Sequence, residues 1–329
     1  MTQDMWSKEH KSMEARLTEA VNHCRPFAQD GKTASYIPAL ANANASDLGI
    51  CLMGCDGRIV QAGQWEKPFT MQSVSKVISF MLACICQGIS RVMDMVDVEP
   101  TGDAFNSIIR LESSQPGKPF NPMINAGAIS ISSMLPGRRP EDKIESLLQF
   151  YEDLTGKRPR INEEVFASEW ATANRNRAIA YYLKDTGYLQ TEVEEALEVY
   201  LKQCSIEVNT VDLARIGFIL SRDGYDPIKN KTLFSKRIAK ITKALMLTCG
   251  MYDASGKMAA FIGIPAKSGV SGGILASVPP RVGENDPSFP FSYGCGIGIL
   301  GPAIDQAGNS VAGIKLLEWV ADEWELSVF

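Results

Sequence analysis

The feature that most constrains this chain is the uncharged stretch at residues 77–85, which follows a polar segment that begins at Pro68. A helix in this stretch would be apolar on nearly every face, so we expect it to lie inside the molecule. Pro68 favours a helix that begins just after it. The sequence therefore predicts a buried central helix, around which the rest of the chain must pack.

Ser73 and Lys76 stand at the beginning of this predicted helix. A spacing of three residues places both side chains on one helical face, and the unpaired N–H groups of a first turn stabilise a developing anion. Burial disfavours the ammonium form of a lysine, and the neutral amine can accept a proton from a serine hydroxyl. The pair therefore predicts a nucleophile, Ser73, and its base, Lys76. Because Ser-x-x-Lys arises by chance roughly once in a chain of this size, the prediction depends on its context.

Composition excludes several classes of function. With 45% hydrophobic and 22% charged residues, the chain resembles an ordinary globular protein of one large or two closely joined domains. A net charge of −5 argues against nucleic acid or a membrane surface as a partner. No apolar run is long enough to span a bilayer, and residues 1–6 lack the layout of a signal peptide. We therefore expect a cytoplasmic protein.

The histidines and cysteines narrow the chemistry further. His10 and His23 both lie in a solvated amphipathic helix predicted over about residues 2–23, which argues against a Ser-His-Asp triad and against a histidine-ligated metal site. We expect neither a metal nor a cofactor. The eight cysteines show no Cys-x-x-Cys pair and read as buried thiols of a reducing compartment. They are Cys24, Cys51, Cys55, Cys84, Cys86, Cys204, Cys249 and Cys295.

The predicted elements indicate a mixed α/β (α+β) fold. Runs at 47–54 and 58–64 around Cys-Asp-Gly predict a hairpin, and Gly-rich runs at 250–257, 258–266, 267–278 and 293–301 look strand-like and supply three more strands. Helices are predicted over about 143–154, 193–200, 209–221, 235–247 and 310–325. We expect one antiparallel sheet flanked by terminal helices, built from residues 1–70 and 251–329, and a helical lobe from residues 71–250. Ser73 would lie in the cleft between them.

Four further side chains have two interpretations each on sequence grounds. Tyr36 in the Tyr-Ile-Pro loop either packs or projects into a site, and Asn125 is either a buried amide that binds something or a helix cap. Glu169 and Asn176 are seven residues apart, so one face of a helix could carry both toward a ligand. The alternative for these two is an ordinary solvated face.

A Lys267-Ser268-Gly269 strand is predicted to face the Ser-x-x-Lys helix across the cleft. Its glycines let the backbone approach a ligand, which makes the Val270 N–H a candidate oxyanion donor beside that of Ser73. Lys267 could also lower the pKa of Lys76 by charge repulsion, and desolvation by the apolar helix is the alternative cause.

Six stretches of the chain carry a resemblance to the serine-dependent glutaminases of the β-lactamase-like superfamily, in their compact bacterial form. They are Gln72-Ser-Val-Ser-Lys76, Asn121-Pro-Met-Ile-Asn-Ala-Gly-Ala, Ser168-Glu-Trp to Asn174-Arg-Asn-Arg, Tyr200-Leu-Lys-Gln-Cys-Ser, Cys249-Gly-Met-Tyr-Asp-Ala-Ser-Gly and Pro265-Ala-Lys-Ser-Gly-Val-Ser-Gly-Gly. The resemblance covers about residues 30–300. It implies a β-lactamase/transpeptidase-like fold and hydrolysis of L-glutamine to L-glutamate and ammonia through a serine-linked glutamyl intermediate.

The resemblance also implies a set of site residues. Ser73 is the expected nucleophile and Lys76 its base, and the substrate contacts carry over to Tyr36, Ser73, Asn125, Glu169, Asn176, Tyr200, Tyr252 and Val270. No Ser-Asp-Asn element is present and Lys-Ser-Gly replaces the usual Lys-Thr-Gly, so Tyr200 and Tyr252 are expected to share proton transfer, in an order that stays open. A buried Glu169 would suit the substrate ammonium group, and Asn and Tyr donors its carboxylate. We expect a homodimer or homotetramer.

Two other functions remain open at this point. A penicillin-interacting peptidase or β-lactamase would need export, which the lack of a signal peptide argues against. A non-catalytic ligand sensor on the same scaffold would lack a Lys76 poised to deprotonate Ser73.

Overall fold

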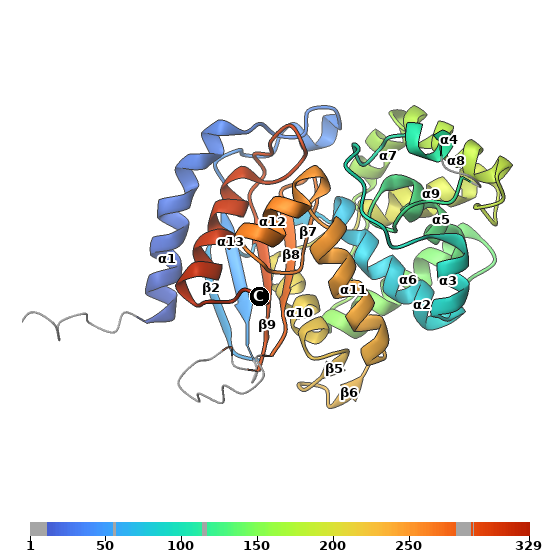
Figure 1. The fold of residues 1–329 in the computed structure, drawn as a ribbon. Helices are drawn as coiled ribbons and strands as arrows, with labels where there is room; N and C mark the ends of the chain where they lie inside the picture. The colour runs from blue at the N-terminus through green and yellow to red at the C-terminus, as the bar shows by residue number, and fades with distance from the viewer. Residues whose placement is uncertain (1–11, 55–56, 114–116, 281–290, 292) are drawn as a thin grey trace, which may run out of the picture.

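The computed structural model describes residues 12–54, 57–113, 117–280, 291 and 293–329, and Figure 1 shows their arrangement. The helices are α1 Met13–Cys24, α2 Ser75–Gln87, α3 Ile89–Met95, α4 Ile109–Ser113, α5 Asn125–Met134, α6 Pro140–Thr155, α7 Glu163–Ala171, α8 Asn174–Asp185, α9 Val193–Cys204, α10 Thr210–Ser221, α11 Lys236–Cys249, α12 Ser255–Phe261 and α13 Val311–Glu323. Short 3-10 helices are η1 Arg25–Asp30, η2 Pro38–Leu40, η3 Gln72–Val74 and η4 Tyr252–Ala254.

The strands form one large antiparallel sheet and two small ones. They are β1 Gly49–Met53, β2 Ile59–Gly63, β3 Phe69–Thr70, β4 Glu207–Val208, β5 Tyr225–Asp226, β6 Lys231–Thr232, β7 Ala266–Ser268, β8 Gly273–Val278 and β9 Cys295–Leu300. The five-stranded sheet has the order β2-β1-β9-β8-β7, and β3–β4 and β5–β6 are separate pairs. The hairpin β1–β2 pairs Gly49 with Gly63 and Met53 with Ile59. This confirms the predicted joining of the first two strands to the last three, although Cys55 lies outside the described residues.

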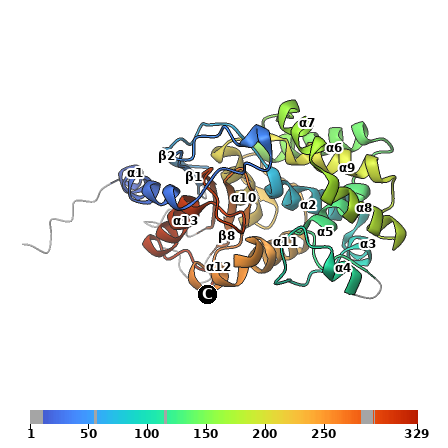
Figure 2. The same cartoon turned by 90° about the horizontal axis from the view of Figure 1, so that it is seen from above.

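Helices cover both faces of this sheet, which is why its inner strands are buried along their whole length. Every residue of β1, β8 and β9 is buried, whereas the edge strand β2 alternates between buried and exposed positions. The terminal helices α1 and α13 pack on each other and on one face, and α10 packs on the other (Figures 1 and 2). The expectation of a sheet flanked by the terminal helices is therefore confirmed.

Glycines bring α10 against the sheet. A Cβ atom at Gly217 of α10 would collide with the Ala276 carbonyl of β8, and one at Gly296 of β9 would collide with the Ala214 carbonyl of α10. Because α10 comes from the predicted helical segment but packs against the sheet, the two parts of the molecule are closely joined. The proposed division at residues 70 and 251 remains a prediction.

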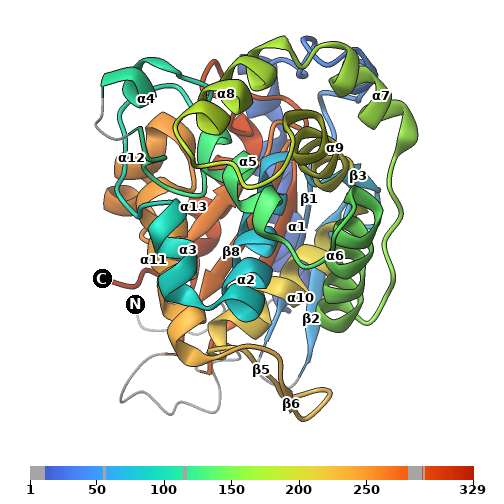
Figure 3. The same cartoon turned by 90° about the vertical axis from the view of Figure 1, so that its right-hand side faces the viewer.

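The helical lobe is built around α2, as the uncharged stretch predicts. Residues Ser75 to Cys84 are all buried, and α2 contacts α3, α5, α6 and α11, which surround it in Figure 3. Other predicted helices also form: α6 and α10 match their expected ranges closely, and α11 follows Ser235, which caps it through a bond from the Ile238 N–H. At the N-terminus the described part of the predicted helix is α1, and His10 lies outside the described residues.

Three sequence predictions were wrong in detail. The strand-like runs at 250–257 and 258–266 fold mainly as η4 and α12, because their small residues are equally compatible with a helix. The run at 267–278 is two strands, β7 and β8, joined by a tight turn in which the Gly272 N–H donates to the Gly269 carbonyl at 2.9 Å. Finally, no helix begins directly after Pro68, because Phe69 and Thr70 form β3 and α2 begins at Ser75.

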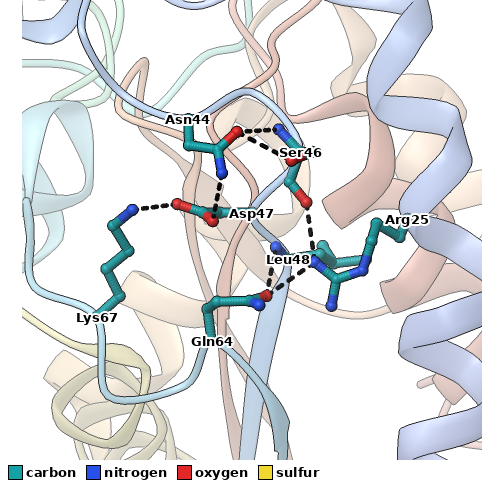
Figure 4. A network of polar contacts seen from close by, with 7 residues as sticks. All are labelled: Arg25, Asn44, Ser46, Asp47, Leu48, Gln64 and Lys67. Atoms are coloured by element: carbon teal, nitrogen blue, oxygen red, sulfur yellow. Dashed lines mark hydrogen bonds and ion pairs between the residues drawn. The ribbon is translucent and has the colours of Figure 1, made fainter.

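A polar network holds the loop before β1 against the end of β2 and the segment that leads to Ser73 (Figure 4). The Arg25 guanidinium donates to the carbonyl of Ser46 and to Gln64 Oε1, both at 2.9 Å. Asp47 accepts from Asn44 Nδ2 at 3.1 Å and pairs with Lys67. These contacts join the N-terminal segment to the open end of the hairpin, where β1 begins and β2 ends.

Candidate active site

A cavity of about 870 Å³ lies where the end of the sheet meets the helical lobe. Segments far apart in the sequence line it: the loop at 29–37, the turn at Gln72 and Ser73, residues 104–106, the junction of α7 and α8, α9, and the loop at 304–308. Of the predicted site residues, Tyr36, Ser73, Asn125, Glu169, Asn176, Tyr200 and Val270 line this cavity. The structure therefore brings these seven together.

Ser73 lies in a 3-10 turn rather than in the first turn of an α-helix. The turn follows β3, and Gln72, immediately before Ser73, has a φ of +47°, a conformation unusual for a residue other than glycine. The Ser75 hydroxyl donates to the Gln72 carbonyl at 2.7 Å and fixes the turn from inside. This geometry places Ser73 at the cavity, with 8% of its surface exposed.

Lys76 lies one turn further along and is completely buried. Its Nζ donates to Asn125 Oδ1 at 2.7 Å and to the Met123 carbonyl at 3.2 Å, and it lies about 6 Å from the ring centres of Phe105 and Tyr200. Desolvation by this environment lowers the pKa of Lys76 to about 8. A substantial neutral fraction is therefore present under mildly alkaline conditions.

No direct hydrogen bond joins Ser73 to Lys76 in the described chain. Catalytic hydrogen bonds are commonly long in an unliganded site and tighten when substrate binds. The arrangement remains suited to proton transfer because Ser73 and Lys76 are three residues apart on consecutive helical turns, which places both side chains on one face.

Asn125 and Asn176 form a chain with Lys76. Asn125 is the first residue of α5, but its side chain is not the cap of that helix: besides accepting from Lys76, it donates from Nδ2 to Asn176 Oδ1 at 2.9 Å. The Nδ2 of Asn176 is then the outermost donor of this chain.

Glu169 and Asn176 are not on one helix, contrary to the sequence expectation. Glu169 belongs to α7 and Asn176 to α8, with a break at Thr172 and Ala173, yet both line the cavity. Glu169 Oε1 accepts from Gln72 Nε2 at 2.8 Å. Desolvation raises the pKa of Glu169 to about 7, against the opposing effects of that hydrogen bond and of Lys76.

The two tyrosines have different surroundings. The Tyr252 hydroxyl is buried beside Ser73, and the Ser73 hydroxyl acts to lower the pKa of Tyr252. The Tyr252 hydroxyl makes no hydrogen bond of ordinary geometry within the described residues. Burial raises the pKa of Tyr252 and keeps its hydroxyl protonated. The Tyr200 hydroxyl interacts instead with Cys204, and burial raises its pKa as well. Tyr252 is thus the tyrosine nearer to the nucleophile.

Lys267 lies beneath Tyr252. Its Nζ is 4.3 Å from the centre of the Tyr252 ring and donates to the Ser268 carbonyl at 2.6 Å. Lys267 is completely buried, and desolvation holds its pKa well below the usual range. Desolvation is also the main cause of the lowered pKa of Lys76, and the nearby Cys204 and Glu169 act in the opposite direction.

The β7–β8 turn brings a backbone donor to the nucleophile. A Cβ at Gly269 would press against the Met71 carbonyl. Only glycine therefore lets this turn come close to Met71 and Gln72, the two residues before Ser73. Within the described chain, the N–H groups of Ser73 and Val270 donate to no other protein group. They are therefore available to a ligand.

Sequence reasoning missed three residues of the site. Phe105 covers Lys76 and lies with its ring centre 4.9 Å from that of Tyr252. Gln72 contacts Glu169, and Cys204 lines the cavity near Ser75. No signal in the sequence marks Phe105, because an aromatic residue in a loop usually reads as packing. Gln72 had a signal, since it adjoins the nucleophile inside a matching stretch.

In the described part of the chain, no cluster of three or more His, Cys, Asp or Glu side chains is arranged to hold a metal ion. Within the same residues, none of the helices has the length and apolar character needed to cross a membrane.

The antiparallel sheet, the helical lobe, and the Ser-x-x-Lys turn opposite a Lys-Ser-Gly strand define a serine hydrolase of the β-lactamase-like fold. A model of the glutaminase family matches residues 31–329, and the chain belongs to this family. It is 62% identical over 314 residues to Glutaminase 1 of Bacillus subtilis, covering 95% of each chain. It is a glutaminase, an enzyme that hydrolyses L-glutamine to L-glutamate and ammonia.

Solved structures agree with this assignment. A crystal structure of a probable glutaminase from Bacillus subtilis matches with a TM-score of 0.90 at 60% identity, over 95% of this chain and 97% of that one. A second structure shows a Bacillus subtilis glutaminase in covalent complex with 5-oxo-L-norleucine, formed by reaction with 6-diazo-5-oxo-L-norleucine. It matches with a TM-score of 0.86 at 57% identity, over 95% of this chain and 99% of that one.

Proposed function

We propose that this glutaminase cleaves the side-chain amide of L-glutamine with Ser73 as nucleophile and Lys76 as general base. The observation that carries the proposal is the complete burial of Lys76 one turn after Ser73, with its pKa lowered to about 8. A neutral Lys76 takes the hydroxyl proton as Ser73 Oγ attacks the amide carbon, and a C–O bond forms. The N–H groups of Ser73 and Val270 receive the oxyanion.

Collapse of the tetrahedral intermediate breaks the C–N bond and requires a proton on the departing ammonia. We assign the delivery of this proton to Tyr252, whose protonated hydroxyl lies beside Ser73 and whose own proton is replenished from Lys76. Water then attacks the glutamyl ester and gives its proton to Lys76; the C–O bond to Ser73 breaks, glutamate is released, and Lys76 returns the proton to Ser73 Oγ. Tyr200, held toward Cys204, has the lesser part in proton transfer.

Substrate recognition follows from the charges of the cavity. Free glutamine carries an ammonium group, which the Glu169 carboxylate suits, and a carboxylate, which Asn176 Nδ2 and the Tyr36 hydroxyl suit as neutral donors. Asn125 positions two other site residues, because its side-chain amide is hydrogen-bonded to both Lys76 and Asn176. Ser268 and Gly269 shape the strand end that presents Val270.

A covalent probe tests the assignment of the nucleophile. Treatment with 6-diazo-5-oxo-L-norleucine, followed by peptide mass spectrometry, should place the adduct on Ser73, and Ser73→Ala should remove it. The thiol of Cys204 lines the same cavity and is the internal competitor. An adduct on Cys204, or one that persists in Ser73→Ala, would contradict the proposal.

We further propose that the enzyme acts in the cytoplasm as a homodimer or homotetramer. Light scattering coupled to size-exclusion chromatography of the full chain should give two or four times the 36.0 kDa of one chain. A mass of a single chain would contradict this proposal.

A further inference from the structure

The side chain of Gln72 connects two functions of the cavity. Only 3% of its surface is exposed, and its Nε2 donates to Glu169 Oε1 at 2.8 Å and to Thr70 Oγ1 at 3.3 Å. Its backbone is part of the turn that carries Ser73. The residue therefore contacts the Glu169 carboxylate through its side chain and, through its backbone, forms part of the turn that carries the nucleophile.

The backbone of Gln72 is held in a costly conformation. A φ of +47° is accessible to glycine without penalty, whereas other residues adopt it only when their surroundings require it. Two contacts hold it here: the Ser75 hydroxyl donates to the Gln72 carbonyl, and the amide reaches Glu169. A position that favours glycine but carries a buried glutamine points to a need for that side chain.

We propose that Gln72 is a positioning residue that orients the Glu169 carboxylate for the substrate ammonium group and ties it to the turn bearing Ser73. The inference rests on the proposed role of Glu169 in recognising that ammonium group. One carboxylate oxygen accepts from Gln72, which leaves the other oxygen directed to the substrate. Because Gln72 is also part of the turn that carries Ser73, it fixes the position of the Glu169 carboxylate relative to Ser73. The ammonium group and the reacting amide of one substrate molecule can then be bound at the correct separation.

Gln72 also helps to keep Glu169 ionised. Burial raises the pKa of Glu169 to about 7, and the hydrogen bond from Gln72 is the larger of two effects that lower it, the other being the charge of Lys76. The remaining titratable groups that face Glu169 are Tyr36, Tyr200 and Cys204. Burial raises the pKa of Tyr200 and Cys204, and partial loss of water contact raises that of Tyr36, which is 57% exposed, so all three stay uncharged. The cavity wall further contains Asp30, Lys32, Arg175 and Asp305. No other neutral donor to Glu169 is present among the described side chains.

The test measures L-glutamine binding against pH in the full chain, with Ser73→Ala as the background that suppresses turnover. Binding should weaken as pH falls through the pKa of Glu169. We call the pH below which binding weakens the pH break. Gln72→Met keeps the length of the side chain but removes the donor that favours the ionised Glu169, so the pH break should move to higher pH. Because a hydrogen bond to a charged group corresponds to about one pKa unit or more, the dissociation constant at pH 6 should rise about tenfold further relative to its alkaline limit.

Two control variants separate the possible outcomes. Gln203→Met removes a fully buried amide whose atoms make no hydrogen bond within the described chain, and the pH break should stay in place. Glu169→Gln should abolish the break. If the break persists in Glu169→Gln, the proposed function of Glu169 fails. If Glu169→Gln abolishes it but Gln72→Met weakens binding equally at every pH, only the positioning role of Gln72 is overturned.

A further variant guards against a failure to fold. Gln72→Gly lacks the donor as well, but glycine adopts positive φ freely, so this variant should fold where Gln72→Met does not. Circular dichroism and thermal melting report the fold, and the same upward shift of the pH break is expected. If neither variant folded, Gln72 would serve the fold rather than the site, and the proposal would be overturned.

Discussion

The rate of this enzyme should rise with pH because Lys76 must lose its proton before it can activate Ser73. With a pKa of about 8, roughly half of Lys76 is neutral at pH 8 and about a tenth at pH 7. With the ordinary lysine value of 10.5, only about three molecules in ten thousand would be neutral at pH 7. At pH 7, burial therefore increases the fraction of enzyme that has a neutral Lys76 about 300-fold.

The assay is ammonia release at saturating glutamine, from pH 6 to pH 9. An added viscogen should leave the rate unchanged, which shows that chemistry rather than product release is limiting. The ascending limb should be centred near pH 8. A rate that is flat across this range, with chemistry limiting, would refute Lys76 as the base.

Lys267→Met distinguishes the two causes of the lowered pKa. Desolvation is the main cause of the lowered pKa of Lys76, and desolvation also lowers the pKa of Lys267, which favours its uncharged form. The ascending limb should therefore stay in place in Lys267→Met. A limb that moves to higher pH would show that Lys267 is charged and repels the Lys76 ammonium, which would refute desolvation as the main cause.

Three further predictions address the catalytic pair and the fold. Ser73→Ala and Lys76→Ala should each nearly abolish ammonia release, and the double variant should be little worse than either, whereas additive losses in log rate would argue against a shared step. Arg215→Ala should lower the free energy of unfolding by about 3–5 kcal/mol in urea titration, because it leaves Asp226 buried without its ion-pair partner; a loss below about 1 kcal/mol would contradict this. Gly217→Ala should cost about 1–3 kcal/mol in the same titration by forcing α10 away from the carbonyls of β8, and an unchanged midpoint would mean that the helix shifts freely.

Local patterns were enough for elements whose structure depends on their own residues. The apolar run of α2, the β1–β2 hairpin and the helices α10 and α11 formed where the sequence predicted them. Their signals are periodicity and turn chemistry, which act within a few residues. Family motifs added the site residues as expectations, and the structure gathers most of them around one cavity.

Patterns of small residues were less informative. The Gly- and Ala-rich segment at 250–266 was expected to form strands, but it folds mainly as η4 and α12. Such residues satisfy both periodicities, so packing against α11 decides between them. Likewise, the seven-residue spacing of Glu169 and Asn176 suggested one helix, whereas they approach the cavity from two.

The sequence by itself determined that this chain has a buried apolar helix next to the Ser-x-x-Lys motif, only two histidines, and the motifs of its family. Only the tertiary structure decided the state of the charges. Whether Lys76 and Lys267 are neutral, and whether Glu169 is ionised, depends on how completely segments from distant parts of the chain exclude water from them. The same distant contacts set the strained turn at Gln72, because no local pattern requires a positive φ at a glutamine.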